Sequence, residues 1–197
     1  MNCLTQGFIA MVPAMLILTF AVTLKTMTGL LGADVYVAGL MQGASTGLTN
    51  MLPAIIFLVA CFLAFASGTS WGTFGILIPI VTGVFTDPAT GAIVPGAEHL
   101  IIIGVSACLA GAVMGDHCSP ISDTTIMASA GAQCNHINHV STQVPYVLTV
   151  AAISFVTYII AGFVQNVVIC LLIGVLLTLM TLIVLKRVFG QKTATQQ

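Results

Sequence analysis

Long apolar runs separated by short polar stretches make up most of the chain, and this alternation predicts an all-α membrane protein. At 1.5 Å per residue, the longer runs are about long enough to cross a hydrocarbon core of about 30 Å. The apolar runs cover residues 8–24, 51–66, 72–85, 100–114, 126–132, 144–163 and 166–185. The pattern therefore predicts a multi-pass helical bundle that forms a single membrane domain over residues 1–197.

The first 50 residues contain one run of about spanning length and then a glycine-rich segment. Lys25 ends the run, and its charge either marks the cytoplasmic side or belongs to a snorkelling side chain. Residues 26–50 fit a glycine-interrupted membrane helix or an interfacial stretch. Asp34 in this segment is a functional carboxylate if it lies at membrane depth, and a turn residue if it lies at the surface.

Residues 51–85 form two apolar arms joined by a short polar sequence. As one straight helix they would be about 50 Å long, which exceeds the thickness of a bilayer. The sequence therefore predicts a re-entrant hairpin or a broken helix, with a surface loop as the alternative. The expected hairpin tip, residues 67–73, offers the candidate residues Ser67, Gly68, Thr69, Ser70, Trp71 and Thr73.

The charged residues suggest a topology for the second half of the chain. Residues 86–99 carry acids and no Lys or Arg, as expected of an external aqueous loop, whereas the tail 186–197 carries Lys186, Arg187 and Lys192. The positive-inside rule then places the C-terminus in the cytoplasm. Counting back through two closing helices over 144–185, residues 133–143 are an inside connection and residues 100–132 cross the membrane. A crossing of this length suits two half-helices with an unwound centre at residues 115–122, near the midplane.

The densest group of polar side chains coincides with this expected discontinuity. Ser119 and Pro120 are suited to cap and begin the second half-helix. Carboxylates, hydroxyls and free backbone carbonyls are hard oxygen ligands that suit a small cation such as sodium. The candidate ion-binding and proton-exchange residues are Asp116, His117, Ser119, Ser122, Asp123, Thr124 and Thr125.

Asp116 and Asp123 flank the discontinuity, and two carboxylates buried close together do not both ionise easily. One of them would hold a proton when no cation is bound, so sodium and protons would compete for the same site. Asp123 could instead be a helix-start acid, whereas Asp116 has no comparable structural role. His117 either tunes the pH response of the site or hydrogen-bonds across the discontinuity.

Composition and the placement of the cysteines argue against several other classes of function and site. The chain is 58% hydrophobic and 5% charged, with a net charge of −1, so it offers no basic surface for nucleic acid. The six cysteines are scattered and are expected to fill apolar space rather than form disulfides or a metal site. His136 and His139 are interpreted as part of a solvated loop rather than a metal pair. A hydrolase using Cys118 and His117 is disfavoured, because adjacent residues rarely present a nucleophile and a base to each other.

Three segments resemble the NhaC-type sodium/proton antiporters of the ion transporter superfamily: residues 67–73, residues 115–125 and residues 139–146. The resemblance extends from about Val12 onward and implies one repeat of an inverted-repeat transporter, with a re-entrant hairpin and a discontinuous helix. It further implies antiport of Na⁺ and H⁺ across the cell membrane by a secondary transporter that is not an enzyme and needs no cofactor. The sodium ligands expected by this resemblance are Asp116, Ser119, Thr69 and Ser70.

The chain resembles only the C-terminal half of these much longer transporters. An ion site between two repeats would then need a missing N-terminal half, a second subunit or a homodimer partner within the lipid bilayer. Two other functions stay open. One is sodium- or proton-coupled exchange of an organic anion or an amino acid by the same fold, and the other is an inactive fragment or interaction subunit.

Overall fold

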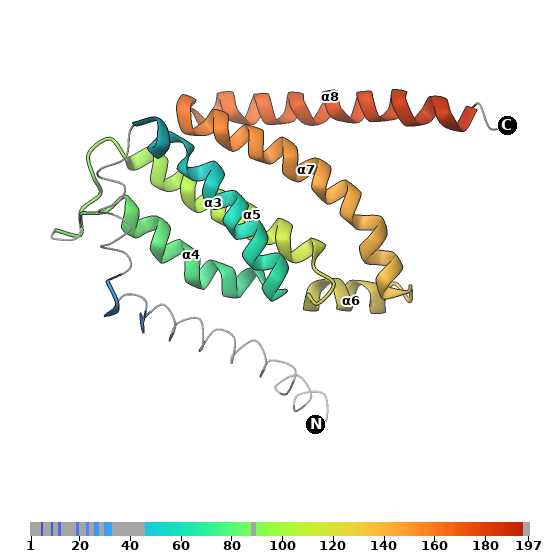
Figure 1. The fold of residues 1–197 in the computed structure, drawn as a ribbon, viewed down its shortest axis with the longest axis horizontal. Helices are drawn as coiled ribbons and strands as arrows, with labels where there is room; N and C mark the ends of the chain where they lie inside the picture. Colours follow the sequence, from blue (N-terminus) through green and yellow to red (C-terminus); the bar gives the residue numbers. More distant parts are fainter. Residues whose placement is uncertain are drawn as a thin grey trace.

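The structure is a computed structural model. It describes residues 46–87 and 90–194, together with scattered positions from residue 5 to residue 32. The expectations for Lys25, for Asp34 and for most of the run 8–24 lie outside the described residues. The named helices, shown in Figure 1, are α3 (Thr46–Ser67), α4 (Ser70–Val84), α5 (Glu98–Cys118), α6 (Asp123–Gly131), α7 (His136–Val164) and α8 (Val167–Ala194).

Four of these helices are long and apolar enough to cross a membrane: α3, α5, α7 and α8. The helix α4 is also apolar but has only 15 residues. In the described part of the chain, the extended pairing consists of one isolated bridge between Thr86 and Ile93. The all-helical prediction is therefore confirmed, and the loop expected before α5 is present, whereas a re-entrant path for α3 and α4 stays a prediction.

The helices α3 and α5 lie side by side and touch through small residues (Figure 1). A Cβ atom added at Gly111 would meet the carbonyl oxygen of Phe57, and one added at Gly115 would meet that of Cys61. Two glycines four residues apart allow helix backbones to approach closely, which is a common way for membrane helices to associate. The contact between α3 and α5 is therefore a backbone-to-backbone contact.

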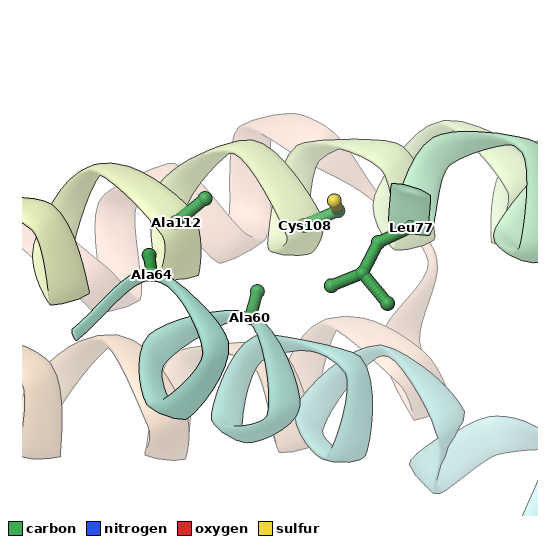
Figure 2. Close-up of a cluster of buried hydrophobic side chains, with 5 residues drawn as sticks. All are labelled: Ala60, Ala64, Leu77, Cys108 and Ala112. Carbon is green, nitrogen blue, oxygen red and sulfur yellow. The ribbon is translucent and has the colours of Figure 1, made fainter. Parts of the chain in front are cut away.

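Next to these glycines lies a buried cluster shared by three helices, shown in Figure 2. Ala60 and Ala64 of α3 face Cys108 and Ala112 of α5, and Leu77 of α4 closes the cluster. All are buried, and the small side chains leave little space between the helices. This contact holds α4 against the pair formed by α3 and α5.

The helices α7 and α8 form the two closing spans predicted from residues 144–185, but α7 begins earlier than expected. The residues between them, Gln165 and Asn166, make the expected turn: Gln165 has a φ of 51°, and the Asn166 side chain accepts hydrogen bonds from two backbone N–H groups of α8. Figure 1 shows α8 next to α7 near the turn that joins them, and diverging from α7 and from the other helices toward the C-terminus. The large apolar side chains described along α8 are mostly exposed, as suits a helix facing lipid.

The expected connection over residues 133–143 is wrong in its length. The Asn135 side chain accepts a hydrogen bond from the N–H of Asn138 at 3.2 Å, which caps α7 at its start. His136 and His139 therefore lie on a helix and not in a solvated loop.

Candidate functional site

The discontinuity between α5 and α6 is shorter than expected: residues 119–122, here called the break, are the non-helical ones. Asp116 lies in the last turn of α5, whose 21 residues exceed a half-helix. Ser119 and Pro120 do not begin α6 either. The N–H of Ser119 donates to the Asp116 carbonyl at 3.1 Å, and the N–H of Ser122 donates to the Ser119 carbonyl at 3.3 Å. The break therefore forms a hydrogen-bonded turn of its own, and Ser122 is the residue that directly precedes α6. The depth of the break in a membrane stays a prediction.

Asp116 is a buried residue whose carboxylate meets two hydroxyl groups. It is 2% exposed. Ser122 Oγ donates to one carboxylate oxygen at 2.7 Å, and Thr124 Oγ1 donates to the other at 3.3 Å. Ser122 is itself fully buried, so water is largely excluded from that side of the carboxylate. Burying a charged group with only neutral hydroxyls as partners is costly.

When Asp116 is ionised, the side chains of Asp116, Ser122 and Thr124 have fewer hydrogens than close oxygen–oxygen contacts. Ser122 Oγ also lies 2.7 Å from Thr124 Oγ1, which makes three close oxygen pairs among three side chains. The two hydroxyls supply one hydrogen each, and an ionised carboxylate supplies none. A third hydrogen on the carboxyl group completes a closed ring of three hydrogen bonds. A cation bound by the same oxygens would also remove the mismatch.

Ser119 brings a further hydroxyl into the break without a partner. Its side chain is fully buried, and its Oγ has no hydrogen-bond partner among the described residues. A buried hydroxyl without a partner normally costs about 1–3 kcal/mol, so such a group calls for a ligand or a water. Thr125, 4% exposed in the first turn of α6, is the other candidate residue that the structure buries here.

Asp123 and His117 are exposed, in contrast to Asp116. Asp123 accepts a hydrogen bond from the N–H of Thr124 at 2.7 Å, which is the helix-start role considered for it. His117 Nδ1 lies 2.7 Å from the Val113 carbonyl, so the hydrogen bond described for His117 stays within its own helix and does not cross the break. Among the described residues, no three His, Cys, Asp or Glu side chains are grouped as metal ligands would be.

The polar side chains of the tip between α3 and α4 form hydrogen bonds with the backbone of the tip itself. Thr69 Oγ1 accepts the N–H of Gly72 at 3.3 Å and caps α4, and the buried Thr73 donates to the Thr69 carbonyl at 2.9 Å. Ser67 Oγ lies 3.5 Å from the same carbonyl, whereas Trp71 is exposed and meets Phe74 edge to face. The hydrogen bonds of Asp116 go to Ser122 and Thr124, and thus not to the expected tip ligands Thr69 and Ser70.

The tip nevertheless touches the break. Gly68 adopts a φ of +67°, and a Cβ atom added there would lie 2.9 Å from the Ile121 side chain and 3.0 Å from its carbonyl. Glycine is required twice at this position, by the left-handed backbone and by the neighbour. The two segments singled out in the sequence therefore come together in the fold through Gly68 and Ile121.

Replacing Gly68 with alanine is expected to destabilise the protein more than replacing Gly91, because both have the same backbone strain but only Gly68 has a close neighbour. Gly91 has a φ of +68° and nothing within 4 Å of an added Cβ. We expect Gly91→Ala to cost about 1 kcal/mol and Gly68→Ala about 2–3 kcal/mol. Thermal unfolding midpoints in detergent measure the difference. Equal midpoints would mean that the contact between the tip and the break carries no energy.

One residue at the break was not expected from the sequence. His136 Nε2 lies 2.7 Å from the Pro120 carbonyl, and its Nδ1 lies 3.0 Å from Ser129 Oγ. The signal that could have placed it was Asn135, a favoured N-cap residue immediately before it, which marks the start of α7.

Comparison with known proteins identifies relatives that are antiporters by name. The chain is 43% identical over 157 residues to an uncharacterised protein of Haemophilus influenzae, a match covering 80% of this chain and 28% of that protein. It is 32% identical over 120 residues to the arginine/ornithine antiporter of Halobacterium salinarum, covering 59% and 23%. It is 30% identical over 121 residues to the malate-2H⁺/Na⁺-lactate antiporter of Bacillus subtilis, covering 59% and 24%.

The chain thus spans only about a quarter of the length of these curated relatives. No solved structure matches it. The model of the Na⁺/H⁺ antiporter family matches residues 1–163, which include the tip, the break and Asp116. The chain therefore belongs to the Na⁺/H⁺ antiporter family.

Proposed function

We propose that the chain is part of a secondary antiporter that exchanges sodium for protons, with Asp116 as the group that binds either ion. Family membership indicates a transporter rather than an enzyme, and the relatives support antiport in general. The observation that carries the proposal is the buried carboxylate of Asp116, whose three oxygen pairs lack one hydrogen. No cofactor is required, because the transported ions are the only reactants.

Proton and sodium would stabilise the same oxygens in different ways. With a proton on Asp116, the carboxyl group, Thr124 and Ser122 form a closed ring in which each hydroxyl donates once and accepts once. When sodium binds, the proton leaves, the carboxylate supplies the charge and the hydroxyl oxygens of Ser122 and Thr124 turn their lone pairs to the cation. The unpartnered hydroxyl of Ser119 offers a further oxygen from the break. Each ion then excludes the other, which is the requirement for exchange.

The remaining ligands would come from outside this group. The tip hydroxyls of Thr69 and Ser70 are the nearest candidates for these ligands, because Gly68 holds the tip against Ile121. Since the chain spans about a quarter of its relatives, an opposing wall of the site would be supplied by a missing N-terminal half, a second subunit or a second copy in the bilayer. In a cell membrane, the exposed Lys186 and Arg187 near the end of α8 favour a cytoplasmic C-terminus.

A second candidate is coupled exchange of an organic solute. The names of two relatives specify amino acids in one case and carboxylates with sodium and protons in the other. In that case, the Asp116 group would carry the coupling ion, and the solute would bind on the opposing wall.

The proposal is tested in everted vesicles, with a fluorescent pH indicator reporting proton movement. The chain is expressed alone and together with the unmatched remainder of the Haemophilus relative. We expect added sodium, but not potassium, to release protons. Proton movement that requires arginine, malate or lactate would instead support the second candidate. A lack of response to all of these in both preparations would favour the inactive fragment or interaction subunit.

A further inference from the structure

His136 connects three elements around the ion site. It is the first residue of α7, its Nε2 lies 2.7 Å from the Pro120 carbonyl in the break, and its Nδ1 lies 3.0 Å from Ser129 Oγ in α6. Pro120 and His136 are sixteen residues apart in the chain. The imidazole ring therefore joins the break to two helices at once.

The chemistry of these contacts fixes the role of Nε2. A carbonyl oxygen only accepts hydrogen bonds, so Nε2 carries a hydrogen and donates it to Pro120. Nδ1 meets the hydroxyl of Ser129, which is 3% exposed and also donates to the Ile126 carbonyl at 2.9 Å, so the one hydroxyl hydrogen serves Nδ1 and that carbonyl together. Both nitrogens are occupied by protein groups, so the ring has no free nitrogen for a metal ion or for a proton relay to Asp116.

Pro120 lies between the two serines of the break. Ser122, on one side, donates to Asp116, while Ser119, on the other, is the buried hydroxyl without a partner among the described residues. Holding the Pro120 carbonyl fixes the path of the backbone between them. Holding Ser129 at the same time keeps α6, and with it Thr124, at a fixed angle to α7.

We propose that His136 is a positioning residue of the ion site: it holds the break and α6 so that Ser122 and Thr124 meet the Asp116 carboxylate. The inference rests on the proposed function of Asp116, and it adds a residue that acts through the Pro120 carbonyl without touching the ion. It also assigns the two nitrogens different tasks, which substitutions can separate.

The variants His136→Gln and His136→Asn separate the two contacts. The glutamine amide N–H₂ lies about where Nε2 does and can donate to Pro120, whereas the shorter asparagine reaches only the position of Nδ1 and Ser129. His136→Ala removes both contacts. His139→Ala is the matched control, because His139 lies about one turn further along α7 and takes part in neither contact.

The first readout does not depend on transport. Cys118 directly precedes the break and is 5% exposed, so its alkylation by N-ethylmaleimide reports opening of the break. The other five of the six cysteines are replaced by alanine. We expect His136→Ala and His136→Asn to raise the alkylation rate about tenfold, the effect of losing one hydrogen bond to the break. His136→Gln and His139→Ala should label at the rate of the unchanged chain.

The second readout is sodium-driven proton release in the same vesicles, where we expect His136→Gln to retain exchange that His136→Asn loses. Equal labelling of all variants, or labelling of His136→Gln as fast as that of His136→Ala, would overturn the positioning role. If the unchanged chain exchanges no ions while the labelling pattern appears as expected, the proposed function fails and the structural role of His136 stands.

Discussion

Asp116→Asn is expected to abolish sodium-driven proton exchange while leaving the fold intact. Asparagine has nearly the same shape, and its amide can still meet Ser122 and Thr124, but it neither ionises nor releases a proton. Loss of the charged ligand should weaken sodium binding by about 100-fold, the equivalent of roughly 3 kcal/mol. Loss of the ionisable group removes proton coupling altogether. Proton release in everted vesicles measures the loss of coupling, and equilibrium binding of radiolabelled sodium measures the loss of affinity.

Asp123→Asn is the matched control for this experiment, because Asp123 is exposed at the start of α6. Its side chain accepts a local hydrogen bond from the N–H of Thr124, which an asparagine oxygen can also accept. We expect this variant to keep exchange within about twofold of the unchanged chain, because an exposed helix-start acid contributes only about 0.3–1 kcal/mol. Equal loss in both variants would mean that Asp116 has no special role.

Gly111→Ala is expected to lower the thermal unfolding midpoint by roughly 5 °C, through a loss of about 2 kcal/mol. A Cβ atom at this position would meet the Phe57 carbonyl oxygen and would lie 2.9 Å from the Ala60 Cβ. Backbone atoms cannot turn aside as a flexible side chain can, so α3 and α5 must move apart. Gly111 lies more than one turn before Asp116, so the change tests helix packing rather than the ion site.

Gly174→Ala provides the comparison for this packing prediction. A Cβ atom there would lie 3.5 Å from Thr157 Cγ2, an ordinary van der Waals contact between α8 and α7. Because alanine favours a helix over glycine by up to about 1 kcal/mol, the midpoint should stay the same or rise. Fluorescence of the single tryptophan, Trp71, follows unfolding in detergent. If both variants unfold at the same temperature, the backbone contact at Gly111 is not important for stability.

The interruptions of the helices could be located from the sequence better than the helix ends. Gly68 and Pro120 interrupt apolar runs, and the chain does turn at both places. The sequence does not predict the start of α7 at His136, because residues 136–143 are polar enough to resemble a loop. Apolar periodicity does not show which face of a membrane helix is buried, because lipid and the protein interior are both apolar. A face packed against protein therefore has the same apolar composition as one exposed to lipid. The close contact at Gly111 and Gly115 could have been predicted from their spacing alone.

The sequence names the residues of the candidate site but not the hydrogen bonds between them. The sequence favours Asp116 over Asp123 as the functional carboxylate, and the structure buries the first and exposes the second. The partners of Asp116 are Ser122 and Thr124, which depend on the turn that the break makes after Ser119. The geometry of such a turn follows from backbone hydrogen bonds between residues that no periodic pattern marks. His136 reaches the break from a separate helix, which sequence spacing does not reveal.

The glycine contact between α3 and α5 has a mechanical consequence. The tip follows the end of α3, and Asp116 lies near the end of α5, so the two are carried by helices whose backbones touch. Such a pair would rotate as one rigid lever, and the distance between tip and carboxylate would hardly change during a transport cycle. Within the proposed function, alternating exposure of the ion would then require this lever and the break packed against it to move together against the rest of the transporter.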